Sequence, residues 1–457
     1  MSAARRKRRA TAHLLPGAIL TIVALQVVPI GAADAQQIAE RIEGRALSLE
    51  ESVALALEGN RAIRDARLGI LTAERQVIEA RGRAMPDISA TASYTRNLQP
   101  LESLLPAIIF DPTASADDFI AVRFGADNNW VSSLSISQPL FDYSVFVGLR
   151  VASRFRQLQV EILRGTAHQA ATSTRKAFHG ILLARERERL TENSVRRLQQ
   201  TLEETRSLNA VGMASDYDVL RLEVELGNLE PQLRQAQDAV EAGQRNLAIT
   251  MGLPVEVTFH PMGSLGDIDV TARQSSTAES RSLVEVVGEP RPFSSDFEEL
   301  VGRALENRSD LRQARLNREL SQAQAQASMS DLFPKLSGIY SYSISAQENG
   351  RPDFFGENSR QQATVMQAGI QIQIPLFSGF QNVSRLRQQQ IAVERSLTSL
   401  EQLQEQARNE VRTLLNALDE TRMRAWAQDR AVEQAQRGFE IASAQYREGV
   451  GSRRPGK

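Results

Sequence analysis

Residues 370–379 read IQIQIPLFSG, and residues 134–142 read LSISQPLFD. In the first stretch isoleucine alternates with glutamine, and in the second leucine and isoleucine alternate with serine. This alternation predicts β-strands with one apolar and one polar face. The pattern alone leaves two interpretations open. One is a half-buried strand of an ordinary antiparallel sheet, and the other is a barrel strand whose apolar face meets lipid.

The two stretches belong to two copies of one long sequence unit. Ala56-Leu57-Glu58 recurs as Ala304-Leu305-Glu306, 248 positions later, and Pro86 recurs at the same spacing as Pro334. A period of this length is far longer than that of a solenoid repeat. The chain is therefore predicted to contain two large units with the same order of elements, helix, strand, strand and long helix.

The elements of each copy can be placed from periodicity and from the prolines. Each copy starts with an expected helix, at 48–83 and at 296–331, which ends before proline because proline cannot continue a helix. In the first copy, residues 36–254, strands are expected at about 87–96 and 130–141, a long helix at 145–209 and a return helix at 216–248. In the second copy, residues 296–452, strands are expected at about 335–346 and 364–377 and a long helix at 380–447. Turn-rich loops are expected at 97–129 and 347–361, and a linker at 255–295.

The two long helices lack proline and would each reach roughly 100 Å at about 1.5 Å per residue. The second one carries an apolar heptad seam, which predicts coiled-coil packing. The seam consists of Val393, Leu397, Leu400, Ala407, Val411, Leu414, Leu418 and Ala425, with Gln404 and Thr421 as polar interruptions. Because the seam is thin, several neighbouring helices are needed to cover it, and homo-oligomerisation would supply them.

The first 35 residues are expected to be a secretory signal peptide. A run of basic residues is followed by a mostly apolar stretch at 14–30 and by Ala33-Asp34-Ala35, so cleavage is expected after about Ala35. The alternative is a membrane anchor, but the apolar stretch is short for one. Export, together with the uncharged polar face of the strands, favours the barrel interpretation of the alternating segments.

Composition excludes several classes of function. The 54 Lys and Arg residues against 55 Asp and Glu residues give a net charge of -1, without the basic excess typical of nucleic-acid binding. There is no cysteine, which excludes disulfides, thiolate metal ligands and a cysteine nucleophile. The four histidines have no metal-ligand spacing. No enzyme activity, cofactor, metal site or nucleic-acid partner is therefore expected.

The order of elements and a set of motifs resemble the TolC family of outer-membrane efflux proteins, over essentially residues 47–452. The motifs are Leu49-Glu50-Glu51-Ser52-Val53-Ala54-Leu55-Ala56-Leu57, Met85-Pro86, Phe333-Pro334, Gln138-Pro139-Leu140-Phe141-Asp142, Ile374-Pro375-Leu376-Phe377-Ser378-Gly379, Gly212-Met213-Ala214-Ser215-Asp216-Tyr217-Asp218-Val219-Leu220 and Met251-Gly252-Leu253-Pro254.

The resemblance implies a fold and a function. The fold is mainly α with four strands per chain, which in a homotrimer form a 12-stranded outer-membrane β-barrel on a long periplasmic α-helical coiled-coil barrel. The function is a passive duct of a tripartite efflux or type I secretion system in a Gram-negative bacterium. Its partners would be outer-membrane lipid, a periplasmic membrane-fusion adaptor and a proton-driven or ATP-driven inner-membrane pump. The alternative is a soluble periplasmic coiled-coil scaffold or adaptor; an exported enzyme is a third, weaker hypothesis. The cargo is left open.

The resemblance also implies a site at the periplasmic tips of the helices. The expected adaptor-docking residues are Val211, Gly212, Met213, Ala214 and Ser215 in the first copy and Gly449, Val450, Gly451 and Ser452 in the second. Asp218 and Tyr446 align with residues of an entrance gate. The ordinary alternatives are a helix N-terminal charge for Asp218 and a packing role for Tyr446.

The second copy departs from the family pattern after Ser452, where only residues 453–457 follow. The family would have a return helix there, and Pro455-Gly456 is a poor helix start. The expectation from sequence is a C-terminally truncated chain with an aberrant tail, which folds or trimerises poorly.

Overall fold

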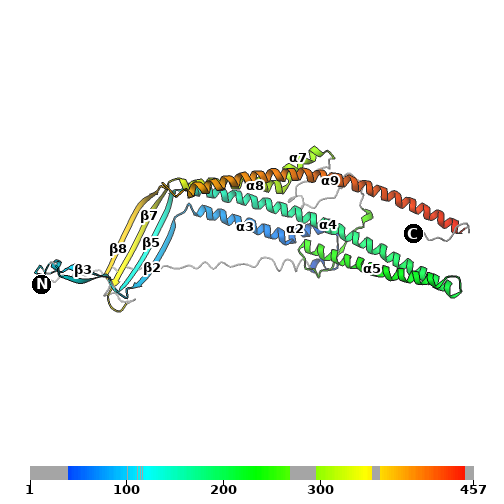
Figure 1. Ribbon diagram of the computed structural model, residues 1–457, viewed down its shortest axis with the longest axis horizontal. Coiled ribbons are helices and arrows are strands. Elements are labelled where there is room, and N and C mark those ends of the chain that lie inside the picture. Colours follow the sequence, from blue (N-terminus) through cyan, green and yellow to red (C-terminus); the bar gives the residue numbers. More distant parts are fainter. Residues whose placement is uncertain are drawn as a thin grey trace, which may run out of the picture.

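The computed structural model describes residues 40–99, 101–110, 112–113, 115, 117–267, 295–352 and 361–447. The molecule is elongated, with a small β-sheet at one end and long helices that extend from it to the other end (Figure 1). It is mainly helical with a minority of strands, which agrees with the expected fold class. The expected signal peptide, the tail at 453–457 and most of the 255–295 linker lie outside the described residues.

The elements of the two halves follow the same order. The first half contains β1 (Ala46–Leu47), α2 (Leu49–Gly59), α3 (Arg61–Gly82), β2 (Asp87–Arg96), β3 (Leu101–Pro106), β4 (Phe119–Phe124), β5 (Asn128–Phe141), α4 (Tyr143–Ala210) and α5 (Asp216–Met251). The second contains β6 (His260–Pro261), α7 (Phe297–Asn307), α8 (Ser309–Met329), β7 (Lys335–Glu348), β8 (Gln361–Gln373) and α9 (Gln381–Arg447). Three short 3-10 turns lie at Ala107–Ile109, Leu265–Asp267 and Ser330–Leu332.

The main sheet is antiparallel, with strand order β2-β5-β7-β8. Directly paired residues share a face, so the register sorts the side chains of all four strands. One row across the sheet is Ala90, Leu134, Tyr342 and Met366. The adjacent row, on the opposite face, is Ser89, Ser135, Ser341 and Gln367. The alternation predicted from sequence is thus in phase across the two copies, and it builds one apolar and one polar face.

The hydroxyl groups of the polar face bond to one another across strands. The Oγ atoms of Ser89 and Ser135 lie 2.8 Å apart, and Thr91 Oγ1 lies 2.7 Å from Ser133 Oγ. On the apolar face large side chains are exposed in the single chain, including Met366 at 66% and Ile370 at 70%. A face of this kind needs a cover of lipid or protein.

The end of β8 differs from the sequence prediction. The strand was expected at about 364–377, but it starts at Gln361 and ends at Gln373. Pro375 has no N–H to donate to a neighbouring strand, so Ile374, Leu376 and Phe377 leave the ladder. In β5 the equivalent Pro139 is kept within the strand through a register shift.

The prediction of one continuous helix before each proline was wrong. The helix at 48–83 is divided at Asn60 and the helix at 296–331 at Arg308, where the backbone is extended with ψ of 128° in both cases. Asn60 Oδ1 accepts the N–H groups of Ala62 and Ile63, and thereby starts α3. Neither break is marked by proline, although Gly59-Asn60 is a pair typical of a helix end followed by an N-cap.

The 97–129 segment was expected to be a loop, and this was also wrong. It contains an antiparallel hairpin of β3 and β4, which projects beyond the end of the main sheet (Figure 1). Its strands are short and their apolar residues do not alternate cleanly with polar ones, which explains why periodicity missed them.

The core lies at the middle of the molecule, where α2, α4 and α5 meet. Phe178 and Ile181 of α4 pack with Leu247 and Met251 of α5 and with Phe259, and all five are at most 2% exposed. A smaller cluster joins Leu311 of α8 to Leu400 and Ala407 of α9.

The heptad seam of α9 is covered only in part within one chain. Leu400 and Ala407 are buried, but Leu414, one heptad further along the same seam, is 61% exposed. None of the helices in the described ranges is both long enough and apolar enough to cross a membrane.

Candidate functional site

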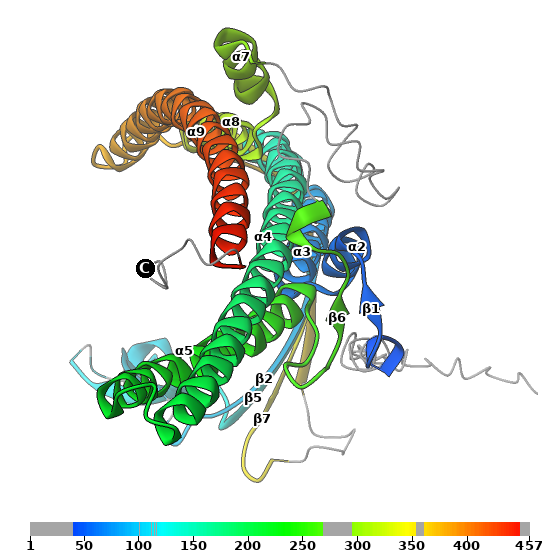
Figure 2. The same cartoon turned by 90° about the vertical axis from the view of Figure 1, so that its right-hand side faces the viewer.

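The tip between α4 and α5 is the candidate site that the structure describes. The two helices run side by side and antiparallel for the whole length of α5, and their connection lies at the end of the molecule opposite the sheet (Figures 1 and 2). Helix α4 has 68 residues, so the tip stands far from the sheet. A partner that binds the tip is therefore far from any lipid or protein that covers the sheet.

Gly212 allows α4 to end in a tight, fully bonded turn. Its φ of +77° lies in the left-handed region, which glycine adopts at little cost. The N–H of Gly212 bonds to the Asn209 carbonyl at 2.9 Å, and the N–H of Met213 bonds to the Leu208 carbonyl at 2.8 Å. These two bonds form a Schellman motif and satisfy the last carbonyls of the helix.

The return into α5 is fixed by side chains. Asn209 Nδ2 donates to the Ala214 carbonyl at 3.0 Å and to Asp216 Oδ1 at 2.9 Å. Ser215 and Asp218 form a capping box, in which Ser215 Oγ accepts the Asp218 N–H and the Asp218 carboxylate accepts the Ser215 N–H, both at 3.2 Å. The tip is thus a rigid turn rather than a loose loop.

The surface of this turn is apolar. Val211, Met213 and Tyr217 are 68%, 77% and 71% exposed. Leu220 continues the exposed strip on α5. Apolar side chains held on a rigid turn are suited to insertion into a groove of a partner protein. Four of the five residues predicted for the first tip lie in or beside this surface, and the fifth, Ser215, caps the helix behind it.

Asp218 lies in the first turn of α5, and its carboxylate is held by Ser215. The hydrogen bond from the Ser215 hydroxyl lowers the pKa of the Asp218 carboxyl below its ordinary value, helped by the Ser215 N–H. The geometry therefore accounts for Asp218 as a helix-capping acid. A role at an entrance gate is neither required nor contradicted by it.

We expect the tip to lose order in acid. A carboxyl whose pKa is depressed on folding stabilises the fold above its ordinary pKa of about 4, and this contribution is lost as the pH falls through the lowered pKa. Hydrogen-exchange protection of the first turn of α5 should therefore decrease below about pH 4. In Ser215→Ala, which removes the main cause of the shift, protection should be lower at neutral pH and the acid step smaller. An unchanged acid step in that variant would contradict the assignment.

The second predicted tip cannot be placed. Gly449, Val450, Gly451 and Ser452 lie outside the described residues. Tyr446 lies in the last turn of α9, but its side chain is outside the described part. The docking role of these residues and the gate role of Tyr446 stay predictions.

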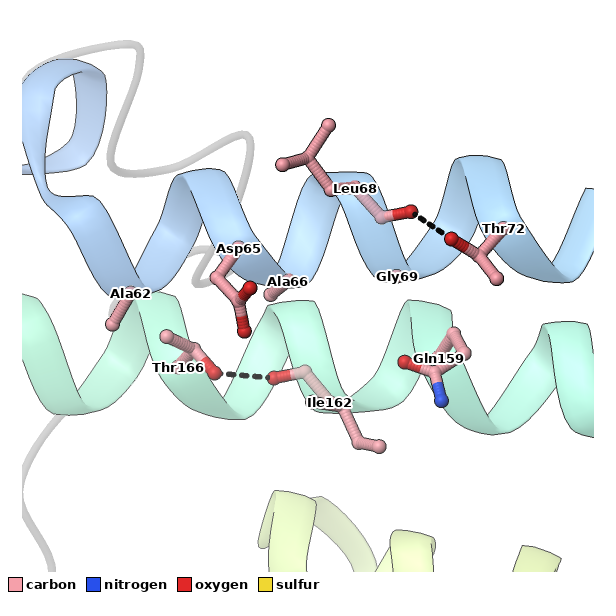
Figure 3. Close-up of a pocket in the computed structure, with 9 residues that line it drawn as sticks. All are labelled: Ala62, Asp65, Ala66, Leu68, Gly69, Thr72, Gln159, Ile162 and Thr166. Atoms are coloured by element: carbon pink, nitrogen blue, oxygen red, sulfur yellow. Dashed lines mark hydrogen bonds between the residues drawn. The ribbon is translucent and has the colours of Figure 1, made fainter.

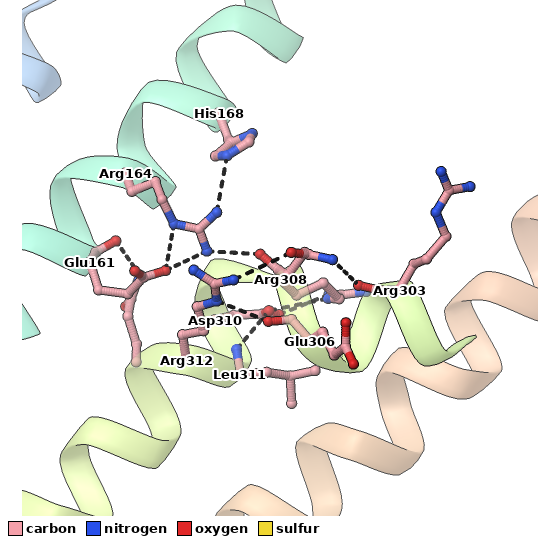
Figure 4. Close-up of polar contacts among 11 residues, drawn as sticks. Glu161, Arg164, His168, Arg303, Glu306, Arg308, Asp310, Leu311 and Arg312 are labelled. Atoms are coloured by element: carbon pink, nitrogen blue, oxygen red, sulfur yellow. Dashed lines mark hydrogen bonds and ion pairs between the residues drawn. The ribbon is translucent and has the colours of Figure 1, made fainter. Parts of the chain in front are cut away.

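A polar network at the junction of the two halves was not singled out from sequence (Figure 4). Arg164 of α4 pairs with Glu161 at 2.5 Å and donates to the Asn307 carbonyl at the end of α7 at 2.8 Å. Arg308 contacts Asp310 at 2.8 Å and Glu410 of α9 at 2.7 Å. The network ties α4, α7, α8 and α9 together at the helix break.

Charges and burial in this network shift three pKa values. Hydrogen bonding to Asp310 raises the pKa of Arg308 above its ordinary value, and the Arg308 contact in turn lowers the pKa of Asp310. His168, half-buried beside Arg164, has a lowered pKa because burial disfavours its charged form. Apart from this network, the internal repeat is visible in equivalent contacts across the two helix breaks. Arg67 and Arg315, 248 positions apart, donate to the equivalent carbonyls of Leu57 and Leu305.

A groove of about 390 Å³ lies between α3 and α4 (Figure 3). Gly69 leaves space there beside Gln159, and Asp65 reaches into the groove. The hydroxyl groups of Thr72 and Thr166 donate to carbonyls of their own helices, at Leu68 and Ile162. The groove is therefore a gap in helix packing whose hydroxyls are already used. Over the residues that the structure covers, no three acidic, histidine or cysteine side chains converge as metal ligands.

Comparison with known proteins adds to this geometry. Residues 53–253 and 300–456 match the family model described as outer membrane efflux protein. The chain is similar to the alkaline protease secretion protein AprF of Pseudomonas aeruginosa, with 24% identity over 310 residues that cover 67% of this chain and 59% of that protein. The chain thus spans about three fifths of the length of this curated relative.

Solved structures show the same fold. The outer-membrane channel OprN superposes with a TM-score of 0.63 at 19% identity, over 88% of this chain and 81% of that one. The outer membrane channel CmeC of Campylobacter jejuni gives a TM-score of 0.63 at 16% identity, over 89% of this chain and 78% of that one. At these identities the likeness concerns the fold alone.

Proposed function

Because the chain belongs to the outer membrane efflux protein family, we propose that it forms a passive duct through the outer membrane of a Gram-negative bacterium. The proposal rests on how the main sheet sorts its apolar and polar side chains onto two opposite faces. Four strands from two halves of the chain place their apolar residues on one face and their hydroxyl and amide residues on the other. An apolar face toward lipid and a polar face toward water are what a membrane barrel requires.

The dimensions of the sheet suit this role. Strand β2 has 10 residues and β5 has 14, which meets the requirement of about 9 to 11 residues for a tilted transmembrane β-strand. The outer strands β2 and β8 each lack a partner on one side within the described sheet. Pairing of β8 with β2 of a neighbouring copy closes the ring, and three copies give twelve strands.

The helices extend the duct into the periplasm. The exposed part of the α9 seam, which includes Leu414, is covered by helices of neighbouring copies. The tip residues, Val211 and Met213 foremost, insert into a periplasmic adaptor, which links the duct to an inner-membrane pump driven by protons or ATP. Asp218 and Tyr446 take part in closing the entrance. The duct needs no catalysis, and its energy comes from the pump.

The name of the relative AprF supports a secreted polypeptide as cargo. A soluble periplasmic scaffold, the alternative, would account for the long helices. It would leave the exposed apolar face of the sheet, with Met366 and Ile370, without a cover.

The docking role of the tip is tested by placing a charge at its most exposed apolar position. We expect Met213→Asp to weaken adaptor binding and export at least about tenfold, because an unpaired carboxylate would be buried in the partner's groove. Adaptor cross-linking and export of cargo are the measurements. Met213→Leu is the matched control and should behave as the unmodified chain.

The same experiment separates docking from assembly. The amount of heat-modifiable trimer in outer-membrane fractions should be equal in both variants, since the connection between α4 and α5 lies at the end of the molecule opposite the sheet. Full export by Met213→Asp would exclude this tip as the docking surface. Trimers of the unmodified chain that give no channel steps in a planar bilayer would refute the duct itself.

A further inference from the structure

The hairpin of β3 and β4 has no counterpart among the described residues of the second half, and the duct proposed above gives it no role. It continues β2 and β5 beyond a bend, where Asn97 N–H and Nδ2 bond to the carbonyls of Asp127 and Ala126, each at 2.8 Å. Gly125, with a φ of +88°, makes the bend possible. The hairpin therefore projects from the end of the sheet that lies away from the helices (Figure 1).

Both faces of this two-stranded ribbon carry exposed apolar side chains. The register pairs Leu105 with Ile120 and Leu104 with Ala121, so these two pairs lie on opposite faces. Val122 and Phe124 share the face of Ile120, which we call face A, and Phe119 shares the face of Leu104, which we call face B. Leu104 and Phe119 are 68% and 59% exposed, and Ile120 and Phe124 are also exposed.

Such a ribbon needs a cover on each side. An isolated two-stranded hairpin is marginally stable in water, and one with two exposed apolar faces would also invite aggregation. Face B also carries the cross-strand ion pair of Glu102 and Arg123, at 3.7 Å, whose side chains are both exposed. The two charges offset each other, so identical ribbons do not repel one another.

The position of the hairpin argues against lipid as the cover. Strands β2 and β5 are long enough to span the hydrocarbon layer by themselves, and the hairpin begins where they end. It would therefore stand in the aqueous space outside the membrane. The hairpin directly continues β2, the edge strand at which neighbouring copies meet in the proposed duct. In that duct the hairpins of all copies stand around the same mouth, so each could find an apolar cover in the hairpin of the next copy.

We infer that the β3–β4 hairpins of neighbouring copies pack face A against face B and form an apolar collar around the outer mouth of the duct. In a closed ring each hairpin has one neighbour on either side, which covers both faces with identical contacts. This inference rests on the proposed trimeric duct. The collar narrows the exit, so it restricts what leaves the duct after the barrel.

Cysteine cross-linking tests the collar cleanly, because the chain contains no cysteine of its own. The test variant combines Leu104→Cys on face B with Ile120→Cys on face A, and its control is Leu104→Cys alone. The two positions point to opposite sides of the ribbon, so they cannot form a disulfide within one hairpin. Cells that carry each variant are oxidised, and outer membranes are analysed on denaturing gels after heating.

We expect covalent trimers from the double variant and monomers from the control. Dimers from the control would refute the collar. Monomers from both variants, while heat-modifiable trimers and export persist, would also refute the collar but leave the proposed duct unaffected. If trimers of the unmodified chain form but give no channel steps, the duct itself is refuted. Leu104→Ser supplies a second measurement, in which a looser collar should raise single-channel conductance. An unchanged conductance in that variant would also count against the collar.

Discussion

Gly252→Ala is expected to destabilise the folded chain by about 4 kcal/mol, the sum of backbone strain and steric overlap. Gly252 ends α5 with a φ of +78°, which an alanine adopts at a cost of about 1 to 2 kcal/mol. A Cβ atom at this position would also overlap the carbonyl group of Gly59, and would lie 3.1 Å from the Asn60 nitrogen. Overpacking of a tight backbone contact costs about 1 to 3 kcal/mol or more.

Two matched variants separate these causes. Gly212 has almost the same φ, +77°, but a Cβ there meets no atom within 4 Å, so Gly212→Ala carries the strain without the overlap. Gly59→Ala carries the overlap without the strain, since its Cβ would lie 2.6 Å from the Met251 carbonyl oxygen. We expect both to fall between the unmodified chain and Gly252→Ala in thermal unfolding followed by circular dichroism in detergent. Equal stability of Gly252→Ala and Gly212→Ala would contradict the close approach.

The contact between Gly252 and Gly59 shows what the sequence could not reveal. Gly252 was visible as a helix end, because glycine followed by leucine and proline stops a helix. Its role as a contact point was not visible, because Gly59 and Asn60 come from the beginning of the same half of the chain. Asn60 Nδ2 donates to the Thr250 carbonyl at 2.7 Å, which locks the break between α2 and α3 onto the end of α5. Gly59-Asn60 is a local pair typical of a helix end followed by an N-cap, but nothing near it in sequence indicates the contact with α5.

Local patterns did predict the features that depend on neighbours in sequence. Alternation placed the strands of the main sheet, absence of proline placed α4 and α9, and Ser215 with glycine before it placed the first tip. The tip was predictable because its bonds, from Gly212 to Asn209 and from Ser215 to Asp218, join residues within one turn. The β3–β4 hairpin and the Arg164–Asn307 contact were missed because register and tertiary position decide them.

Met366→Arg is expected to block insertion of the sheet into the outer membrane, whereas Gln367→Arg should be tolerated. The two residues are neighbours in the middle of β8, but they pair with Tyr342 and Ser341 and therefore lie on opposite faces. Both are exposed in the single chain. Placing an arginine on the lipid-facing side near the middle of the bilayer costs about 2 to 4 kcal/mol of free energy per strand. An arginine on the water-facing side stays hydrated.

The size of this effect follows from the symmetry of the proposed assembly. Each chain of a trimer carries the substitution, so the cost is incurred three times in one barrel, and even the lower figure of about 2 kcal/mol would strongly deplete the inserted form. The measurement is the fraction of chain recovered as heat-modifiable trimer in outer-membrane fractions. Equal recovery of both variants would mean that the face of Met366 does not meet lipid, and the sheet would then have to be covered by protein. If only Gln367→Arg fails to be recovered as inserted trimer, the face of Gln367 is the one that meets lipid. The proposed assignment of the two faces of the sheet would then be wrong.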